Sequence, residues 1–271
     1  MRKTVVVRGG GDLATGVVQK FYRAGFKVVI LEKEKPLAIR RTVALCQGVY
    51  DREHQVEEMT ILLAQSPDEC SEVWKQGKVP ILIDPEGKWI EEMKPDIVID
   101  GIMAKKNLGT HKNMASITVA LGPGFVAGED VDAVVETKRG HHLGRLYFKG
   151  SAIDNTGIPG ELEGITTERV VYAPCSGKVK HIKDIGNEVK EGEGIFCIDD
   201  FKVSSPLDGT LRGLIHEGLM VREGMKCADI DSRKEAKEYC YSISDKARAI
   251  GGATLEATLI LLNEKGDDHD F

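Results

Sequence analysis

Short apolar runs and amphipathic stretches alternate along the first half of the chain. Residues 4–8 form a β-branched run that ends in a glycine turn, and an amphipathic stretch closed by Gly25 follows. A second apolar run, over 27–31, ends in Glu32. A strand, a glycine turn, a helix and a strand form a βαβ unit with a right-handed crossover. The pattern therefore predicts an α/β, Rossmann-like, doubly wound N-terminal domain.

Later segments extend this domain. The sequence predicts a helix over about 56–64, and a second helix that opens with a capping box at 66–69 and ends at Gly77. Three further runs are typical of buried parallel strands: 79–83, 97–100 and 117–121. Ligands of such sheets collect beyond the carboxyl ends of the strands. We therefore expect three segments to share one crevice: Gly9–Asp12, Asp100–Asn107 and Gly122–Gly128.

The first of these segments has the spacing of a dinucleotide-binding turn. Gly9, Gly11 and Ala14 match G-x-G-x-x-G/A, and Glu32 lies where an acidic residue meets a ribose 2′-hydroxyl. The start of the helix would then face a phosphate, which its dipole and free N–H groups favour. Asp12 counts against a plain dinucleotide site, because its carboxylate would lie near the pyrophosphate. The alternative is a Rossmann-like turn that serves packing and binds nothing.

The second half of the chain contains an internal repeat with an offset of 32 residues, between 171 and 231. The matched pairs include Pro174 with Pro206, Gly177 with Gly209, Gly186 with Gly218, Val189 with Val221 and Ile198 with Ile230. Each copy is too small to bury a face alone, so the repeat predicts two interlocked copies in a β-sandwich. The pattern resembles biotinyl and lipoyl carrier domains, which are barrel-sandwich hybrids. Lys202 lies too close to Pro206 for a projecting lysine hairpin, so we expect a scaffold or docking surface.

These patterns divide the chain into four regions. We expect a Rossmann-like domain at 1–130, a glycine-rich bridging segment at 131–165, a barrel-sandwich hybrid domain at 166–232, and a C-terminal helix with an acidic tail at 233–271. Within the bridging segment, 132–136 and 143–148 alternate like a hairpin. Pockets favour domain boundaries, so we expect a ligand to bind between the two domains.

Glycines are dense between Leu121 and Gly160, where the chain contains GPGFVAG, ETKRGHHLGR and NTGIPG. Glycine lets backbone N–H groups approach a ligand without a Cβ in the way. Two glycine turns around Arg139 and His141 suit a bulky anion, while plain hairpin turns are the competing interpretation.

The order of these motifs resembles the YqeB family, accessory proteins of selenium-dependent molybdenum hydroxylase systems. The opening VVVRGGGDLATGVV, the pair Arg40-Arg41 and the segment DGIMAKKNLGT at 100–110 share the resemblance, which covers nearly the whole chain. It implies a cytoplasmic helper in the maturation of a molybdenum enzyme, and it implies no particular reaction.

Composition limits the classes of partner. The 271 residues, 41% hydrophobic and 30% charged, are typical of a soluble globular protein with room for two cores. A net charge of −6 offers no global basic surface for nucleic acid or membrane lipid. The chain lacks a signal-peptide pattern and a membrane-spanning run, which predicts a cytoplasmic protein. The six cysteines have no metal-binding spacing, so we expect no metal site.

The motifs give one set of candidate residues for binding a cofactor. They are Gly9, Gly10, Gly11, Asp12, Glu32, Arg40, Lys105, Gly122, Gly124, Glu136, Thr137, Arg139, Gly140 and His141. We expect Arg139 to bind phosphate, and Glu136 and His141 to form hydrogen bonds to a pterin or to hold a proton.

Three functions fit these candidates. The first is an accessory or maturation factor that binds the molybdenum-pterin cofactor or a nucleotide and serves a molybdenum hydroxylase or its maturation machinery. The second is an NAD(P)-dependent oxidoreductase, and the third is a non-catalytic module that bridges partners. The sequence shows no assembled acid–base or nucleophile constellation, which leaves catalysis open.

Overall fold

A computed structural model describes residues 3–154 and 168–267 and divides the chain into two compact units. The first unit comprises Met1–Pro36, Leu45–Thr156 and Ile243–Phe271, and the second comprises Leu37–Ala44 and Gly157–Ser242. The last glycine motif, at 155–160, and the end of the acidic tail lie outside the described residues.

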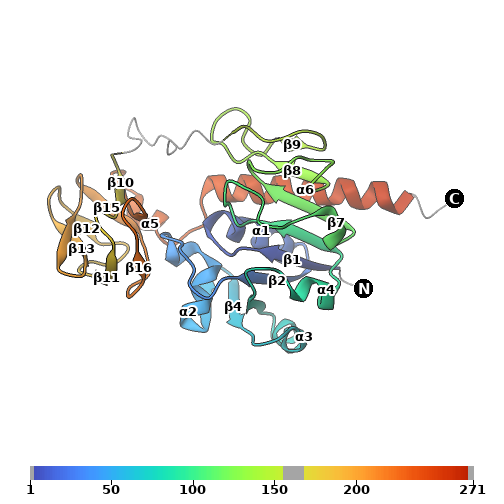
Figure 1. Cartoon of the computed structure of the whole chain (residues 1–271), viewed down its shortest axis with the longest axis horizontal. Coiled ribbons are helices and arrows are strands. Elements are labelled where there is room, and N and C mark those ends of the chain that lie inside the picture. Colours follow the sequence, from blue (N-terminus) through green and yellow to red (C-terminus); the bar gives the residue numbers. More distant parts are fainter. Residues whose placement is uncertain (1–2, 155–167, 268–271) are drawn as a thin grey trace. The chain divides into compact units, whose positions relative to one another are not determined.

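The first unit is built on a nine-stranded, mostly parallel sheet in the order β3-β4-β5-β2-β1-β6-β7-β8-β9 (Figure 1). Its strands are β1 (Thr4–Arg8), β2 (Lys27–Glu32), β3 (Glu53–Val56), β4 (Met59–Leu63), β5 (Val79–Ile83), β6 (Ile97–Asp100), β7 (Ile117–Leu121), β8 (Ala133–Val135) and β9 (Leu146–Tyr147). Only β3–β4 and β8–β9 pair antiparallel. The chain order reverses at β1, which lies between β2 and β6, so loops from both halves of the sheet begin beside its carboxyl end.

Most of the predicted elements of this unit are confirmed. The βαβ unit, the three buried strands and the hairpin of 132–136 with 143–148 are all present. The predicted helix over 56–64 is wrong. Val56 ends β3, Glu57 takes a φ of 51°, and β4 follows with Met59 and Ile61 buried against the core. A short apolar run does not separate strand from helix, and pairing with β5 decides it here.

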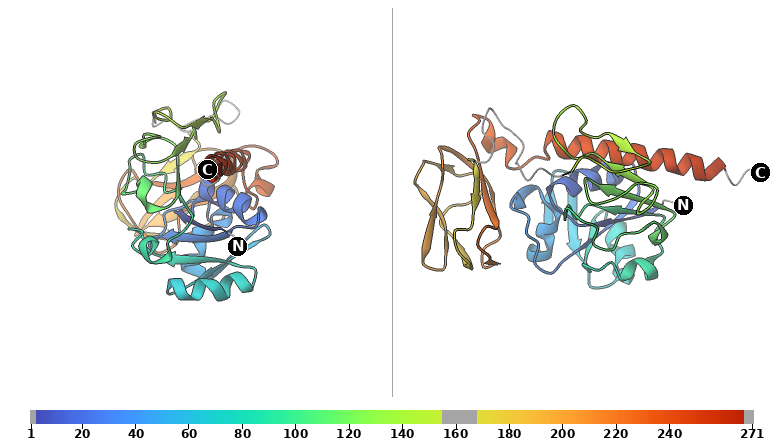
Figure 2. Two further views of the ribbon diagram at one scale, coloured as in Figure 1. Left: turned by 90° about the vertical axis from the view of Figure 1, so that its right-hand side faces the viewer. Right: turned by 45° about the horizontal axis from the view of Figure 1, so that its top comes forward.

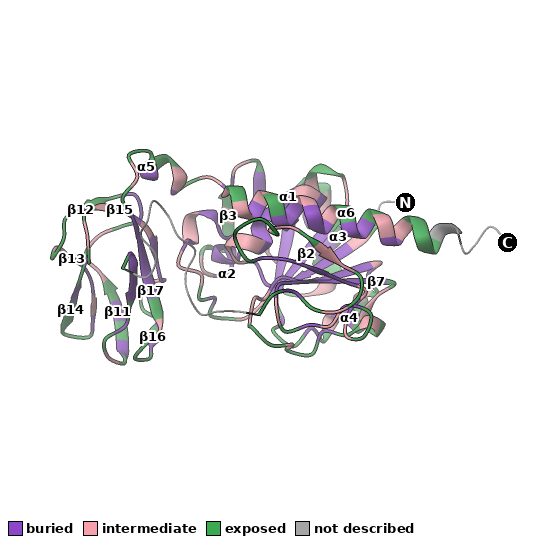
Figure 3. Ribbon diagram, turned by 90° about the horizontal axis from the view of Figure 1, so that it is seen from above, coloured by how far each residue is buried: buried purple, intermediate pink, exposed green. Residues whose placement is uncertain are grey.

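Helices cover both faces of the sheet (Figure 2). The helices of this unit are α1 (Asp12–Arg23), α2 (Gly48–Asp51), α3 (Cys70–Lys75), α4 (Trp89–Met93) and α6 (Asp245–Asp267), with 3₁₀ helices η2 (Leu45–Gln47), η3 (Pro67–Glu69) and η4 (Lys112–Met114). Helices α3 and α4 pack on one face through a buried cluster that includes Cys70, Ile90 and Leu82. The other face is covered by α1 and α6, and the central strands are almost entirely buried, with β6 and β7 buried along their whole length (Figure 3).

Helices α1 and α6 touch through their backbones. A Cβ on Gly16 would overlap the carbonyl group of Ala247, and a Cβ on Gly251 would overlap the carbonyl group of Gly16. Only glycine permits this approach, so these two positions set the distance between the helices. The neighbouring Gly252 faces open space.

The second unit consists of two four-stranded antiparallel sheets, β10-β17-β15-β12 and β14-β13-β11-β16. Their strands are β10 (Val170–Tyr172), β11 (Gly177–His181), β12 (Glu188–Val189), β13 (Gly194–Ile198), β14 (Phe201–Ser204), β15 (Gly209–Leu214), β16 (Met220–Val221) and β17 (Lys226–Asp231). The repeat offset relates β11, β12 and β13 to β15, β16 and β17. Each sheet contains strands of both copies, so the two copies are interlocked as the repeat predicts. The unit also contains η1 (Arg41–Val43) and α5 (Ala236–Tyr239).

Lys202 lies within β14, paired with Cys197 across a two-residue turn at Asp199 and Asp200. Its side chain passes so close to Gly194 that a Cβ there would overlap its Cε atom. The lysine therefore lies along the sheet and does not project from the tip of the hairpin.

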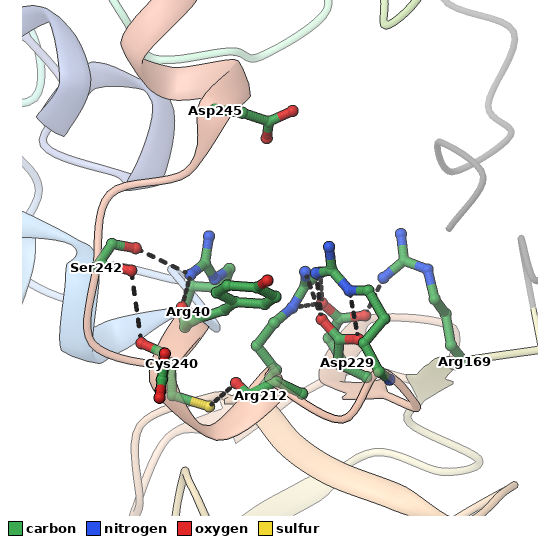
Figure 4. A network of polar contacts seen from close by, with 12 residues as sticks. Arg40, Arg169, Arg212, Asp229, Cys240, Ser242 and Asp245 are labelled. Carbon is green, nitrogen blue, oxygen red and sulfur yellow. Dashed lines mark hydrogen bonds and ion pairs between the residues drawn. The ribbon is translucent and has the colours of Figure 1, made fainter. Parts of the chain in front are cut away.

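A chain of buried ion pairs joins the strands of the second unit (Figure 4). Asp229 accepts hydrogen bonds from Arg169 and Arg212, and Arg212 also reaches Asp231 at 3.1 Å. Asp231 also accepts two hydrogen bonds from Arg233, at 2.6 and 2.9 Å. Both carboxylates are about 2% exposed, and each is held by more than one arginine. Removing one member leaves charge buried without its partner, which is costly.

The helix crossing gives the first prediction. We expect Gly251→Ala to destabilise the first unit by about 1–3 kcal/mol or more, because the new methyl group overlaps α1. We expect Gly252→Ala, one residue away on the same helix, to stabilise it by up to about 1 kcal/mol. Urea denaturation followed by Trp74 and Trp89 fluorescence measures both. Equal stability of the two variants would contradict the crossing geometry.

The ion-pair chain predicts acid sensitivity in the second unit. Burial alone raises the pKa of the Asp231 carboxyl, but hydrogen bonds from Arg233 and the charge of Arg212 lower it below its usual value. Its stabilising effect is therefore complete above the unfolded pKa of about 3.9 and is lost as the pH falls through the lower folded value. We expect Asp231→Asn to cost about 3–5 kcal/mol near neutral pH and to flatten the acid dependence.

Hydrogen exchange of peptides from β15 and β17 between neutral and acidic pH measures this effect in the second unit alone. The control is Asp208→Asn, which removes an exposed ion pair with Lys190 and is expected to leave the exchange unchanged. An acid slope that stays the same in Asp231→Asn would rule out Asp231 as its source.

Candidate functional site

The glycine turn after β1 packs its backbone against the next loop along the sheet. Gly9 has a φ of 90°, and a Cβ there would lie 3.0 Å from the backbone of Ile102. Gly10 packs in the same way against Cys46, whose N–H donates to the Gly10 carbonyl at 2.8 Å. These two glycines are therefore required by packing, whatever else the turn does.

Glu32, at the end of β2, holds this turn in place. One carboxylate oxygen accepts the Gly10 N–H at 2.9 Å, and the other accepts the N–H of Lys33 at 2.9 Å. The sequence placed Glu32 on a ribose hydroxyl, whereas both of its oxygens here accept backbone donors of the protein.

Gly11 differs from its neighbours because the space beside it is open. It is the N-cap of α1, with an ordinary φ of −69°, and no atom lies within 4 Å of where its Cβ would be. No side chain caps the helix, and Asp12 lies in its first turn. The start of α1 is thus the part of the turn that packing leaves open to a ligand.

The loop after β6 is fixed by a buried polar chain. The Arg8 guanidinium donates to Thr110 Oγ1 at 2.6 Å, and the Thr110 hydroxyl donates to Asp100 at 2.5 Å. The other Asp100 oxygen accepts the N–H of Ile102 at 3.1 Å. Burial raises the pKa of the Asp100 carboxyl, and these hydrogen bonds and the Arg8 charge offset only part of the rise.

The loops after β6, β7 and β8 then meet at two more glycines. A Cβ on Gly124 would lie 2.8 Å from the Cα of Lys106, and one on Gly122 would lie 2.6 Å from the Thr137 hydroxyl. Lys105 is exposed and adopts a φ of 63°, a strained conformation for a lysine. The structure therefore brings together the loops that the strand ends predict.

The segment after β8 supplies an anchor and an ion pair. Glu136 is fully buried, and its two oxygens accept the N–H groups of Lys138 and Ile153 at 2.7 and 2.8 Å. Arg139 forms a bidentate pair with Asp245 at 2.6 and 3.0 Å. Gly140, with a φ of 126°, and His141 are exposed beyond it.

Lys246 is a further residue of this region that sequence reasoning missed. It follows Asp245 in the first turn of α6 and is half-buried. Burial lowers its pKa most, Arg139 lowers it further, and Asp12, Glu136 and Asp245 act in the opposite direction. No local motif marks Lys246, because the packing of α6 on α1 is what brings it here.

Arg40 belongs to the second unit, whereas the other candidate residues belong to the first. It is 7% exposed, and its guanidinium donates to the carbonyl of Tyr239 at 2.6 Å and to that of Ser242 at 3.5 Å (Figure 4). Its observed hydrogen bonds are thus structural ones, made to the segment that ends the second unit.

A separate hollow of about 670 Å³ lies between α4 and η4. Its lining includes Ile90, Lys94, His111 and Asn113. None of the candidate residues lines it, and neither does Lys246. The candidate site is therefore the carboxyl edge of the sheet, which we define by Gly9–Asp12, Lys105, Gly122, Gly124, Thr137, Arg139 and Lys246.

The sequence was compared with known proteins. The chain is 48% identical over 260 residues to the uncharacterized protein YqeB of Escherichia coli (strain K12), an alignment that covers 96% of this chain. It is a homologue of YqeB. This similarity supports the YqeB family that the motifs resemble, although the chain spans about half (48%) of the length of that relative. No family model matches the chain.

Solved structures resemble it only weakly. The product-bound ectoine utilization protein EutE (DoeB) of Ruegeria pomeroyi aligns with a TM-score of 0.28 and 8% identity, over 86% of each chain. A succinylglutamate desuccinylase of Silicibacter sp. TM1040 aligns with a TM-score of 0.26 and 12% identity, over 85% of each chain. Likeness at this level carries no argument about function.

No helix among the described residues has the length and apolar character needed to cross a membrane. Within 3–154 and 168–267, no three His, Cys, Asp or Glu side chains are arranged to hold a metal ion.

The buried polar chain predicts that Thr110 is important for stability. We expect Thr110→Val, which keeps the shape and removes the hydroxyl, to cost about 2–4 kcal/mol, because Arg8 and Asp100 both lose a buried partner. Chemical denaturation of the full chain measures this loss.

The matched control is Thr254→Val. That threonine is equally buried, but its hydroxyl donates only to the Ile250 carbonyl of its own helix, so the expected change is below about 1 kcal/mol. Similar losses in the two variants would show that the hydroxyl between Arg8 and Asp100 has no special role.

Proposed function

We propose that this protein is a YqeB-type accessory protein that binds a phosphate-bearing ligand at the carboxyl edge of its large sheet. The observation that carries the proposal is the convergence of the loops after β1, β6, β7 and β8 on glycines. In parallel sheets with a reversal of strand order, ligands bind at this edge, beside the point of reversal. Here that point lies between β1 and β6, and the Gly9–Asp12 turn begins there.

The groups at the edge suit an anion. Gly11 leaves the start of α1 open, and unpaired N–H groups at a helix start favour negative charge. Lys105 and Lys246 add positive charge from two other elements. The carboxylates of the partly buried Glu32 and the buried Glu136 are held by backbone N–H groups, so they stabilise the loops and do not face the ligand with free oxygens.

The identity of the ligand comes from the resemblance to the YqeB family. It favours the molybdenum-pterin cofactor or a nucleotide form of it, held for delivery to a selenium-dependent molybdenum hydroxylase. The cations and open helix start would hold the phosphate of such a cofactor, and the cofactor would supply the redox chemistry in the hydroxylase. The strand order is the one found in Rossmann-like domains, which supports a nucleotide-type site.

The second unit is proposed to be a barrel-sandwich hybrid that acts as a scaffold. Its interlocked repeat supports this assignment. The position of Lys202 along the sheet argues against a swinging arm, since a carrier lysine must project from its hairpin. A docking surface for the hydroxylase or its maturation machinery is the role that remains.

The test is thermal unfolding with a ligand panel of NAD⁺, NADP⁺, ATP, CTP, molybdopterin and its nucleotide forms. A ligand at about a hundred times its dissociation constant adds about 2.7 kcal/mol, which raises the midpoint by about 5–10 °C. We expect this shift with a pterin or nucleotide and expect Gly11→Ser to weaken binding about tenfold or more. Serine is a good N-cap and fits the open space, so the variant stays folded while its hydroxyl occupies the start of the helix.

The control variant is Gly252→Ala, which should retain the full shift because a methyl group there would meet no other atom. A shift with NAD⁺ or NADP⁺ alone would favour the oxidoreductase. The absence of any shift across the panel would reject the ligand site and leave the partner-bridging module.

A further inference from the structure

The loop after β6 contains two residues in a strained backbone conformation. Met103 has a φ of 60° and Lys105 a φ of 63°, whereas the residue between them and the residues on either side have negative φ. A residue with a side chain tolerates a positive φ only in the small left-handed region, and such residues concentrate at ligand sites. Two of them within three positions single out the segment 103–107, which we call the 103–107 turn.

Both ends of this turn are fixed by the rest of the unit. Before it, Gly101 packs so closely on α1 that a Cβ there would lie 2.9 Å from the Cβ of Ala14. At its end, the Asn107 side chain accepts the N–H groups of Gly109 and Thr110, both at 2.8 Å. The Thr110 side chain in turn belongs to the buried polar chain. The strained conformation between these ends is therefore imposed by the fold.

The turn presents five consecutive backbone N–H groups. Within 3–154 and 168–267, no acceptor takes a hydrogen bond from the N–H groups of residues 103–107. The oxygens of Asp100, the only acidic residue between 97 and 116, accept the Ile102 N–H and the Thr110 hydroxyl instead. Alternation of negative and positive φ turns successive N–H groups toward one concave side, the arrangement that binds anions in proteins.

The surroundings of the turn support its backbone and add positive charge. Lys105 and Lys106 are both exposed. Gly124, with a φ of 106°, belongs to the loop after β7 and lacks the Cβ that would lie 2.8 Å from the Cα of Lys106. That loop therefore packs directly on the backbone of the turn. Backbone donors without acceptors and two neighbouring lysines together give this segment the character of an anion site.

We propose that the 103–107 turn binds the anionic group of the ligand, a phosphate or a carboxylate, through its main-chain N–H groups, with Lys105 and Lys106 adding charge. This inference rests on the proposed function, since the turn lies at the same carboxyl edge of the sheet. It assigns the contact to the backbone of one loop and accounts for the strain there. Because the fold already fixes the turn, no loop has to be ordered when the anion binds.

Amide NMR shifts of the full chain measure the contact, with orthophosphate, pyrophosphate and citrate as probes at constant ionic strength. We expect the amide protons of residues 103–107 to move downfield and to saturate, because they donate to a charged acceptor. The amide proton of Lys94 is the control. This exposed lysine has a φ of 43°, but its N–H already donates to the Ile90 carbonyl at 2.9 Å, so its resonance should not move.

The probes also distinguish the two kinds of anion. Saturation with either phosphate would assign a phosphoryl ligand, and saturation with citrate alone would assign a carboxylate ligand. Resonances of residues 103–107 that stay in place, or that drift without saturating, with all three anions would overturn the proposal.

A matched pair of variants separates the backbone from the side chain. Lys105→Asn and Lys105→Val remove the same charge at an exposed position, but asparagine adopts the left-handed region readily and valine does not. We expect the anion that saturates the wild type to bind Lys105→Val about tenfold more weakly than Lys105→Asn. Lys94→Asn and Lys94→Val should both bind it as the wild type does. Equal affinities of the two Lys105 variants would overturn the proposal.

The two proposals fail separately. If a nucleotide or pterin shifts the thermal midpoints of the wild type and Lys105→Val equally, the ligand site stands and the role of the 103–107 turn is wrong. If an anion saturates the turn while no nucleotide or pterin binds, the anion contact stands and the proposed function is wrong.

Discussion

The backbone contact between α1 and α6 is the constraint on which the rest of the first unit depends. Because Gly16 and Gly251 have no Cβ, carbonyl groups of the facing helix occupy the space that a side chain would fill at each position. Glycine within a helix costs about 1 kcal/mol relative to alanine, so both positions lower the intrinsic stability of their helices. The short distance between α1 and α6 requires glycine there nevertheless. In return, a helix from the C-terminus lies on the same face of the sheet as the helix of the first βαβ unit. Its first turn, with Asp245 and Lys246, thereby reaches the loops at the carboxyl edge. Larger residues at the crossing would move that turn away.

The same use of glycine organises the carboxyl edge itself. Gly9, Gly122 and Gly124 each have a positive φ and each press against a neighbouring loop. Glu32, at the end of β2, and Glu136, directly after β8, accept backbone N–H groups and hold the shape of the loops around them. Packing and internal hydrogen bonds thus account for most of the conspicuous residues of the motifs. Gly11 is the informative exception, because neither its conformation nor its surroundings require a glycine.

Local pattern was enough to predict most of the strands and their order along the chain. Alternation, apolar runs and turn residues located the first βαβ unit, the strand ends and the interlocked repeat, all of which depend on neighbours in sequence. The helix predicted over 56–64 is wrong, because so short a segment is compatible with either a strand or a helix. Pairing with β5 makes Met59–Leu63 a strand. The roles of Glu32 and Glu136 could not be predicted either, since no sequence pattern tells whether a carboxylate accepts a hydrogen bond from a ligand or from a backbone N–H. The position of Lys246 depends on a crossing of helices more than 200 residues apart, which no local pattern predicts.

The chemistry of arginine explains the part that Arg139 plays at the edge. The guanidinium is planar and presents two parallel donors, which match the two oxygens of Asp245, so Arg139 is suited to fasten α6 to the loop after β8. An arginine fixed to Asp245 cannot also give its fork to a ligand without releasing the helix. In the structure Arg139 pairs with Asp245, so phosphate binding by Arg139, which the sequence predicts, would require this exposed ion pair to open.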